Sequence, residues 1–552
     1  MNTQERYLQW RESGDAETKA ELETIKNNEK EIAERFSMEL RFGTGGLRGI
    51  LGAGTNRMNL YVVRRATRGL ASYMKKAGLP LRAAVAYDSR INSRLFADET
   101  AKILAACGID AWIYPRLEPT PALSWAIRAL GCGAGVMITA SHNPAEYNGY
   151  KVYGSDGCQI TDEAAGAILA EIQTCGYFDL IYSEGKGKLH QVPENILDEF
   201  LERELAQMTR SLQGLKVVYT PLNGAGLECV RRALQRAGAE EIIVVPEQEH
   251  PDGAFPTCPV PNPEEPKAMA LGLKLCEEEQ ADLLLATDPD CDRVGTAVKD
   301  GGQYRLLDGN QMGVLLFDYI CKTRIKHGKM PRHPVAFTTI VSTEMAADIA
   351  KHYGVELKRT LTGFKYIGEQ IGLLERNGEA DRFIFGFEES YGYLSSPHVR
   401  DKDAVNASLL ICEMTACYKE KGKTLWQIWG ELEEKYGIYM EKLCSFAFPG
   451  VDGFQKMARI MELLRNEPPK RIAGMTVRQI IDYRKAERTG LPVSDVLAFY
   501  LEGGSRVIIR PSGTEPKMKG YLSVRAAARA EGEERLTRIA GEIKGFVFQS
   551  RL

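Results

Sequence analysis

Along most of the chain, short apolar runs alternate with longer segments whose apolar residues recur at helical spacing. Apolar runs of this length, bounded by polar or Gly-containing segments, are typical of strands buried inside a sheet. Strands that alternate with helices predict α/β layers. Residues 15–38, rich in Glu, Lys and Ala, are expected to form surface helices at the start of the first domain. The predicted strands cover residues 83–87, 135–139, 215–219, 242–245, 282–286, 382–385 and 506–509.

The length of the chain requires several domains. Its 552 residues exceed the content of one hydrophobic core, so roughly three to five domains of about 100–200 residues each are expected. Polar or Pro-containing stretches near 207–214, 322–334 and 436–453 are candidate boundaries. The predicted domains are 1–208, 209–322, 323–440 and 441–552.

Composition and charge narrow the class of partner. Lys and Arg total 71 against 74 for Asp and Glu, a formal net charge of −3, and there is no long basic block. Nucleic acid and membrane surfaces are therefore not expected partners. No apolar stretch approaches the ~18 residues of a membrane span, and the charged N-terminus lacks the apolar segment of a signal peptide. Twelve scattered cysteines without a CxxC pair indicate reduced thiols. We expect a cytoplasmic monomer or homodimer that binds a small molecule.

The most chemically specific stretch is an acidic loop, "ATDPDCDRVG", directly after the apolar run 282–286. It places Asp288, Asp290 and Asp292 at alternate positions, and in an extended loop all three carboxylates would face the same way. Three crowded carboxylates repel one another unless a cation neutralises them. Oxygen ligands favour Mg²⁺ or Ca²⁺ over softer metals, so the loop predicts a divalent metal site.

The acidic loop has other interpretations. An EF-hand is excluded, because its sixth and twelfth positions need Gly and Glu, where this chain has Arg293 and Lys299. A phosphatase that uses Asp288 as its nucleophile stays open, and so does a solvated acidic turn. Arg293, beside the cluster, is a candidate clamp for phosphate oxygens.

A second loop, "GVMITASHNPAEYNGYK", places Ser141 at the end of the apolar run 135–139. Ser141 could simply cap a helix, but Pro144 and Gly149 indicate a loop instead. No Gly-x-Ser-x-Gly elbow surrounds it, so a hydrolase triad has no local support. A serine can carry a phosphoryl group, whose added charge of about −1.5 to −2 a nearby divalent metal would offset. His142 and Lys151 could then orient that group or move protons.

Further loops contain residue types that bind phosphates or sugar hydroxyls. "RPSGTEPKMKGY" combines cations, hydroxyls and a glycine, which suits a phosphate cradle, although a Pro/Gly turn with solvated charges fits as well. Gly-rich "RFGTGGLRG" contains Arg48, and "FEESYGY" offers Glu388 and Ser390 as short hydrogen-bond acceptors. The remaining candidates are Gly363 and Lys365 in "TGFKYIGE", Lys402 in "HVRDKDA", and Arg510, Ser512, Gly513, Thr514 and Lys519 in the cradle.

In order along the chain, these motifs resemble those of the α-D-phosphohexomutase family, and most of all its phosphoglucomutase/phosphomannomutase branch. The resemblance covers nearly the whole chain. It rests on "FGTGGLRG", "TASHNP", "DPDCDR", "TGFKYIG", "EESYG", "HVRDKDA" and "RPSGTEPK". It implies an α/β protein of four domains around a central cleft, with three similar mixed α/β domains and a smaller C-terminal α+β domain.

The resemblance also implies roles for individual residues. Ser141 would carry the phosphoryl group, and Asp288, Asp290 and Asp292 would hold Mg²⁺, which also touches the phosphoserine. Glu388 and Ser390 would contact sugar hydroxyls, while the C-terminal loop would grip the phosphate that does not react. Arg48, Lys151 and Lys402 would neutralise charge and shuttle protons near the transfer.

The implied reaction interconverts glucose 1-phosphate and glucose 6-phosphate through glucose 1,6-bisphosphate. Mannose or pentose phosphates, synthesis of the bisphosphate itself and a phosphosugar-binding protein without transfer activity stay open as alternatives. The sequence departs from the family pattern at two positions that bear on proton transfer: Phe364 and Tyr393 stand where some members have histidines in the third domain. Lys402 or Lys151 must be considered for that role instead.

Overall fold

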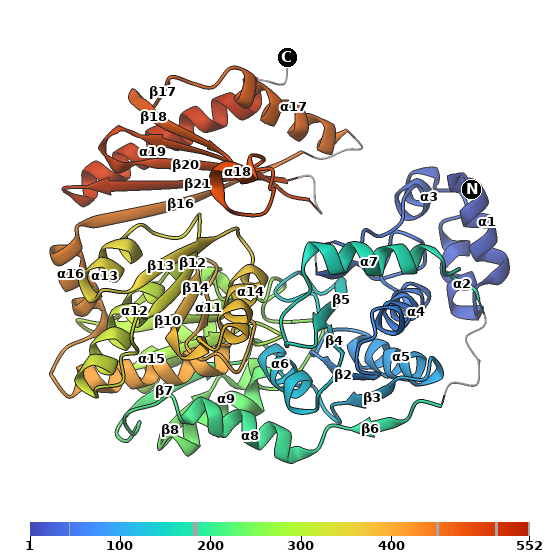
Figure 1. The fold of residues 1–552 in the computed structure, drawn as a ribbon, viewed down its shortest axis with the longest axis horizontal. Coiled ribbons are helices and arrows are strands. Elements are labelled where there is room, and N and C mark those ends of the chain that lie inside the picture. Colours follow the sequence, from blue (N-terminus) through green and yellow to red (C-terminus); the bar gives the residue numbers. More distant parts are fainter. Residues whose placement is uncertain (44, 180–185, 449–451, 514–516, 550–552) are drawn as a thin grey trace. The chain divides into compact units, whose positions relative to one another are not determined.

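The computed structural model describes residues 1–552 except 44, 180–185, 449–451, 514–516 and 550–552 (Figure 1). Contacts divide the chain into two compact units. One unit comprises Met1–Met312 and Phe364–Trp426, and the other comprises Gly313–Gly363 and Gln427–Leu552. No helix in the described part of the chain is both long and apolar enough to cross a membrane.

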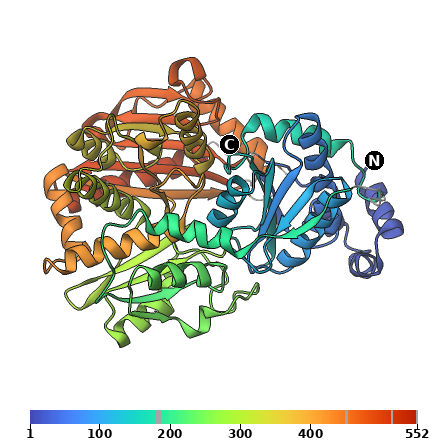
Figure 2. The same cartoon turned by 60° about the horizontal axis from the view of Figure 1, so that its bottom comes forward.

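The first sheet of unit 1 has the strand order β1-β5-β4-β2-β3-β6. β2, β3, β4 and β6 run parallel, whereas β5 is antiparallel to both β4 and β1. The blue strands of this sheet lie between helices in Figure 2, which explains why the central strands β2 and β4 are buried and apolar apart from Arg82 at the start of β2. Their bounds are β1 Gly46–Ile50, β2 Arg82–Tyr87, β3 Asp110–Ile113, β4 Ala134–Ile138, β5 Tyr147–Gly154 and β6 Leu189–Gln191.

The second sheet of unit 1 has the order β11-β10-β9-β7-β8, with β7, β8 and β9 parallel and β10 and β11 antiparallel. A short antiparallel hairpin, β14–β15, belongs to the same unit. The strands are β7 Lys216–Thr220, β8 Glu241–Val244, β9 Leu283–Thr287, β10 Val294–Asp300, β11 Gln303–Leu307, β14 Phe383–Glu388 and β15 Gly392–Leu394.

Unit 2 contains the parallel pair β12–β13 and a six-stranded antiparallel sheet of order β16-β21-β20-β19-β18-β17. α17 and α19 cover one face of this sheet and share a hydrophobic core with it (Figure 1). The strands are β12 Val335–Thr339, β13 Glu356–Thr360, β16 Ile438–Ala447, β17 Arg471–Ile472, β18 Met475–Asp482, β19 Leu497–Leu501, β20 Arg506–Pro511 and β21 Lys517–Ala526.

The helices fill the intervals between strands, and α12 and α16 each continue across a limit between the two units. Their bounds are α1 Thr3–Ser13, α2 Ala16–Thr24, α3 Glu29–Phe36, α4 Leu60–Lys76, α5 Ser93–Ala106, α6 Thr120–Ala129, α7 Asp162–Gln173, α8 Glu194–Leu205, α9 Gly226–Arg236, α10 Pro246–Glu249, α11 Pro266–Glu279, α12 Gly309–Lys326, α13 Met345–Tyr353, α14 Phe364–Arg376, α15 Ala404–Lys419, α16 Leu425–Tyr436, α17 Gly453–Asn466, α18 Ala486–Thr489 and α19 Arg529–Gln549, with 3₁₀ turns at Ala380–Arg382 and Glu502–Gly504.

All the predicted strands are present, and the mixed sheets confirm the α/β prediction. The antiparallel C-terminal sheet with its helices confirms the α+β prediction for that region. α2 and α3 lie within the predicted helical stretch 15–38, whereas α1 was not predicted, because it buries only Tyr7 and Trp10. The division at 1–208, 209–322, 323–440 and 441–552 stays a prediction, and α12 runs through residue 322.

An aromatic cluster attaches the N-terminal helices to the first sheet's domain. Trp10 has no exposed surface, and its ring centroid lies 5.9 Å from that of Phe36, 5.1 Å from Tyr61 and 5.4 Å from Phe178. Such edge-to-face pairs add to the area that the rings bury. We therefore expect Trp10→Ala to cost about 3–5 kcal/mol of local stability.

Hydrogen–deuterium exchange of α1–α3 measures this effect, and exchange there should accelerate strongly in Trp10→Ala. Leu8→Ala is the matched control, because Leu8 lies on the same helix and is 44% exposed. Equal protection in wild type and Trp10→Ala would show that the cluster does not hold these helices.

Candidate active site

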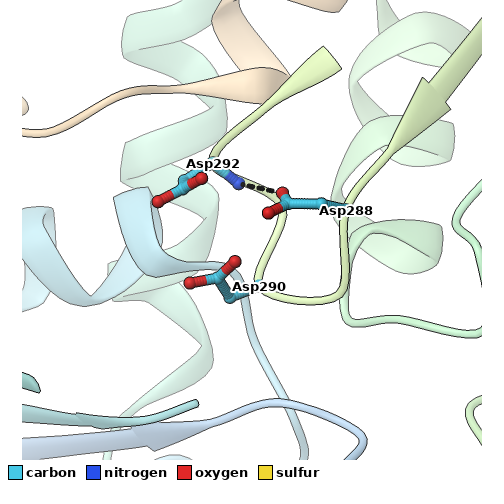
Figure 3. A group of neighbouring side chains, drawn as sticks. All are labelled: Asp288, Asp290 and Asp292. Atoms are coloured by element: carbon cyan, nitrogen blue, oxygen red, sulfur yellow. Dashed lines mark hydrogen bonds between the residues drawn. The ribbon is translucent and has the colours of Figure 1, made fainter. Parts of the chain in front are cut away.

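The acidic loop between β9 and β10 is a tight turn and not the extended segment that the sequence predicted. The Cys291 amide donates to the carbonyl of Asp288 over 2.8 Å, and Cys291 has a left-handed φ of 52°. This curl brings the carboxylates of Asp288, Asp290 and Asp292 together (Figure 3), with possible ligand atoms within 4.8 Å of one another. The three carboxylates therefore converge, as their alternate positions predicted, but a turn brings them together and not an extended segment.

Hydrogen bonds fix the orientation of Asp288. Its Oδ1 accepts the backbone amides of Asp292 at 3.1 Å and Arg293 at 3.0 Å, the first of which is drawn in Figure 3. Its Oδ2 accepts the Ser141 hydroxyl over 2.8 Å. Burial and the charges of Asp290 and Asp292 raise the pKa of Asp288 well above its ordinary value. The two loops singled out in the sequence thus meet at this carboxyl group.

Two lysines partly neutralise the acidic loop. Lys151 Nζ lies 2.7 Å from Asp290 Oδ2, and Lys402 Nζ lies 3.0 Å from Asp292 Oδ2. Burial disfavours both charged lysines, but the neighbouring aspartates outweigh it and raise the pKa of each. Asp401 also accepts a hydrogen bond from Lys402 Nζ, at 3.1 Å, and one from the Tyr153 hydroxyl, at 2.8 Å. Both lysines are therefore cations beside the carboxylates.

The remaining carboxylate oxygens suit a divalent cation. Asp290 Oδ1 and Asp292 Oδ1 are buried and have no hydrogen-bond partner among the residues that the structure describes. Asp292 Oδ1 lies 3.8 Å from Arg293 Nε. Buried, unpartnered carboxylate oxygens are costly, and a hard cation would satisfy them. The donor set of Asp288, Asp290 and Asp292 could therefore hold Mg²⁺.

Ser141 lies in the loop after β4 and has a left-handed φ of 53°, so it does not cap a helix. Its amide donates to Thr139 Oγ1 over 2.8 Å, and the Thr139 hydroxyl donates to Asp88 Oδ2 over 2.6 Å. Ser141 is only 4% exposed. A chain of buried hydrogen bonds thus holds the serine in a backbone conformation that non-glycine residues rarely adopt.

Arg90 holds the same loop through its carbonyl groups. Its Nη1 donates to the carbonyls of Pro144 at 2.9 Å and Tyr147 at 3.1 Å, and its Nη2 donates to those of Ser141 and Asn143. Asp88 lies 3.4 Å from Arg90 Nε. The sequence interpretation did not identify Asp88 and Arg90. The available signal was "DSR" at 88–90, which follows the predicted strand 83–87 just as the other site loops follow theirs.

His142 and Arg48 lie beside the serine. His142 Nδ1 is 3.2 Å from Ser141 Oγ, and burial together with the charges of Arg293 and Arg48 lowers the pKa of His142 well below its ordinary value. Arg48 lies on β1, and not in a loop as predicted, and its Nη1 donates to Asn143 Oδ1 over 3.2 Å. His142 is therefore neutral at physiological pH.

Arg293 joins the acidic loop to the turn after β14. Its Nη1 lies 2.7 Å from Glu264 Oε1 and donates to the Ser390 carbonyl over 2.9 Å. Glu388 is the last residue of β14 and is buried. Lys365, at the start of α14, pairs with Asp162 Oδ1 at 2.6 Å. The structure thus brings Ser390 to Arg293, and it gives Lys365 an acidic partner on α7.

The described residues of the predicted phosphate cradle belong to unit 2 and lie at the end of β20 and the start of β21. Arg510 and Lys519 are opposite each other in the antiparallel register, so their side chains share one face. The Ser512 amide donates to the Lys517 carbonyl over 2.7 Å, and Gly513 is exposed. Thr514 lies outside the described residues. Gly363, also in unit 2, has a φ of 122°, which a glycine adopts readily.

Comparison with protein families gives four matches in chain order. The descriptions are phosphoglucomutase/phosphomannomutase alpha/beta/alpha domain I for residues 39–176, domain II for 196–302 and domain III for 308–436, and the C-terminal domain for 463–545. Together they span most of the chain.

Individual relatives agree with the family matches. A probable phosphomannomutase from Haemophilus influenzae is 39% identical over 85% of this chain and 93% of its own length. A phosphoglucomutase from Staphylococcus aureus is 36% identical over 90% of this chain and 91% of its own. A phosphoglucomutase/phosphomannomutase family protein from Burkholderia thailandensis superposes with a TM-score of 0.70 at 18% identity, over 92% of this chain and 97% of that one, and shares the fold.

The carboxylate cluster predicts how the protein binds Mg²⁺. Asp290→Asn removes one anionic ligand, so calorimetric titration should show Mg²⁺ affinity reduced at least about 10-fold. Asp300→Asn is the matched control, because Asp300, at the end of β10, forms an ion pair with Arg305 on the adjacent strand β11 and lies outside the cluster. Unchanged affinity in Asp290→Asn would exclude the cluster as the metal site.

The raised pKa of Asp288 predicts the pH dependence of the same affinity. The proton and the metal compete for this carboxylate, so a raised pKa extends the competition to higher pH. Mg²⁺ affinity should therefore rise as pH increases above the ordinary carboxyl range towards neutrality. Calorimetry in buffers of different ionisation enthalpy would detect the proton released on binding, and an affinity that falls with pH would contradict the assignment.

Proposed function

The chain belongs to the phosphoglucomutase/phosphomannomutase family of α-D-phosphohexomutases, and we propose that within it the protein interconverts glucose 1-phosphate and glucose 6-phosphate. Members of this family are isomerases that move a phosphoryl group between positions of a hexose. The 2.8 Å hydrogen bond between Ser141 Oγ and Asp288 Oδ2 carries the proposal. It supports the proposal because Ser141 is in contact with a residue of the candidate metal site.

The proposed cycle begins with a phosphoryl group on Ser141. A hydroxyl oxygen of the sugar monophosphate loses its proton and forms a bond to phosphorus, while the bond from phosphorus to Ser141 Oγ breaks and Ser141 Oγ takes up a proton. The product is glucose 1,6-bisphosphate, which turns around in the site. Ser141 Oγ then gives up its proton in the direction of Asp288 Oδ2 and accepts the other phosphoryl group, and the sugar oxygen that is released takes up a proton. The net reaction exchanges the two monophosphates.

The charges around Ser141 support this role. Asp288, Asp290, Asp292 and the phosphoserine would hold Mg²⁺, which when bound supplies charge neutralisation at the phosphoryl oxygens. Lys151 and Lys402 contribute two buried positive charges at the same place. His142 Nδ1, 3.2 Å from Ser141 Oγ, is close enough to orient the serine oxygen.

Sugar and distal phosphate recognition completes the proposal. Arg293, Glu388, Ser390, Gly363 and Lys365 are assigned to the substrate by the family motifs, Arg510, Ser512, Gly513, Thr514 and Lys519 to the phosphate that does not react, and Arg48 to charge neutralisation at the transfer. That cradle must accept either end of the turned sugar. It should therefore recognise phosphate charge rather than details of the sugar, which suits the paired cations Arg510 and Lys519.

A phosphatase centred on Asp288 is less well supported. The nearest nucleophile candidate to Asp288 is Ser141, whose hydroxyl donates to Asp288 Oδ2, while Oδ1 is held by two backbone amides. This arrangement suits Asp288 as a partner of a phosphoryl-carrying serine better than as the phosphoryl carrier itself. Within the family, mannose phosphates are the main rival substrates, because the Haemophilus influenzae relative is described as a probable phosphomannomutase. Pentose phosphates are the other rival.

The test uses glucose 1-phosphate, Mg²⁺ and a trace of glucose 1,6-bisphosphate, with formation of glucose 6-phosphate as the measurement. Ser141→Ala should lower kcat/KM at least about 10⁴-fold, because the phosphoryl carrier is lost. Ser155→Ala, an exposed serine on the strand-end turn after β5, is the control and should match wild type. Phosphate release that survives Ser141→Ala would identify a phosphatase instead.

Substrate preference is tested by the same assay with mannose 1-phosphate and ribose 1-phosphate. We expect the highest kcat/KM for glucose 1-phosphate. Equal or higher values for either competitor would overturn glucose as the preferred sugar while leaving the mutase mechanism intact.

A further inference from the structure

We propose that Thr120 is a positioning residue for the candidate metal site: it fixes the Asp290 carboxylate so that Oδ1 faces the ion. The inference rests on the proposed function, because it concerns the metal loop of that site. Thr120 is separated from Asp290 by 170 residues in the sequence and is fully buried. None of the family motifs in the sequence includes it.

The backbone contact between Thr120 and Asp290 is made at the start of α6. The Thr120 amide donates to the Asp290 carbonyl over 2.9 Å. Amides in the first turn of a helix lack acceptors within the helix, and α6 has no side-chain cap, since Pro119 precedes it and Pro121 has no N–H. The Ala225 amide, at the start of α9, donates to the adjacent carbonyl of Pro289 over 2.8 Å. Two helix starts therefore hold consecutive carbonyls of the metal loop.

The side-chain contact selects one carboxylate oxygen. Thr120 Oγ1 donates to Asp290 Oδ2 over 3.3 Å, and Lys151 Nζ donates to the same oxygen over 2.7 Å. Asp290 Oδ1 has no hydrogen-bond partner among the described residues. Two donors on Oδ2 set the plane of the carboxylate and leave Oδ1 for a cation.

Lys151 alone would hold the carboxylate less firmly. Its ammonium is a point charge on a flexible stem, and it also lies 3.6 Å from Asp292 Oδ2, so it can move between the two carboxylates. Threonine has a stiff side chain whose χ1 angle is restricted by branching at Cβ. Thr120 is also buried away from competing water, so its hydroxyl can fix the direction of Asp290 where Lys151 supplies mainly charge.

The experiment compares Thr120→Val, which keeps the shape and removes the hydroxyl, with Thr120→Ser, which keeps the hydroxyl. Thr100→Val is the matched control, because Thr100 is equally buried and its Oγ1 has no hydrogen-bond partner among the described residues. Calorimetric titration of the full-length proteins with Mg²⁺ should show about 10-fold weaker binding for Thr120→Val. Binding by Thr120→Ser and Thr100→Val should stay close to that of wild type.

Mutase kinetics give a second measurement. In Thr120→Val the Mg²⁺ concentration for half-maximal activity should rise about 10-fold, as the affinity falls. The kcat at saturating Mg²⁺ and the KM for the sugar phosphate should not change. If Thr120→Val does not show a wild-type melting transition, Thr120→Ala replaces it and should show the same loss of affinity.

Three results would overturn the proposal: wild-type Mg²⁺ affinity in Thr120→Val, equally weak binding in Thr120→Ser, or equally weak binding in Thr100→Val. A wild-type protein that does not bind Mg²⁺ would also overturn it. Failure of the proposed function gives a different result. If the protein binds Mg²⁺ but does not convert glucose 1-phosphate, the proposed reaction is refuted, while the Mg²⁺ titrations of the Thr120 variants can still be interpreted.

Discussion

The burial of several like charges in one place is the constraint on which the rest of the site depends. Asp288, Asp290 and Asp292 are at most 1% exposed, and burial of an unpaired carboxylate is strongly unfavourable. The structure offsets this with Lys151, Lys402 and backbone amides, while two oxygens keep no hydrogen-bond partner in the described chain. The surrounding elements hold the charges of opposite sign close enough for this arrangement to be stable.

The ends of buried strands hold the residues of the candidate site in place. Ser141 follows β4, the acidic loop follows β9, and Glu388 closes β14, so each of these segments of the candidate site adjoins a buried strand. Ligands of open α/β sheets bind beyond the carboxyl ends of their strands. The loops can therefore carry left-handed residues such as Ser141 and Cys291, because the strands on either side hold them in place.

This arrangement also explains how much of the site could be predicted from the sequence. Ser141 and the three aspartates could be predicted, because a polar motif directly after an apolar run is a local pattern. The curl of the acidic loop could not, since it depends on the left-handed Cys291. Thr120 makes its hydrogen bond to a distant segment, and no local spacing marks it. Asp88 and Arg90 directly follow a predicted strand, but their hydrogen bonds to the serine loop depend on the fold. Lys365 was assigned to substrate, but its contact with Asp162 needs the packing of α14 near α7.

The long sequence separation of the site's contacts has a consequence for folding. Ser141 and Asp288 are 147 residues apart, and Tyr153 and Asp401 are 248 apart. Contacts between residues so far apart in the sequence require the loop-closure entropy of the intervening chain to be overcome. A chain in which these contacts are absent has a serine loop without its acidic partner. On the proposed function, Ser141 would carry a phosphoryl group only after the segments of unit 1 have assembled, so its phosphorylation would report that assembly.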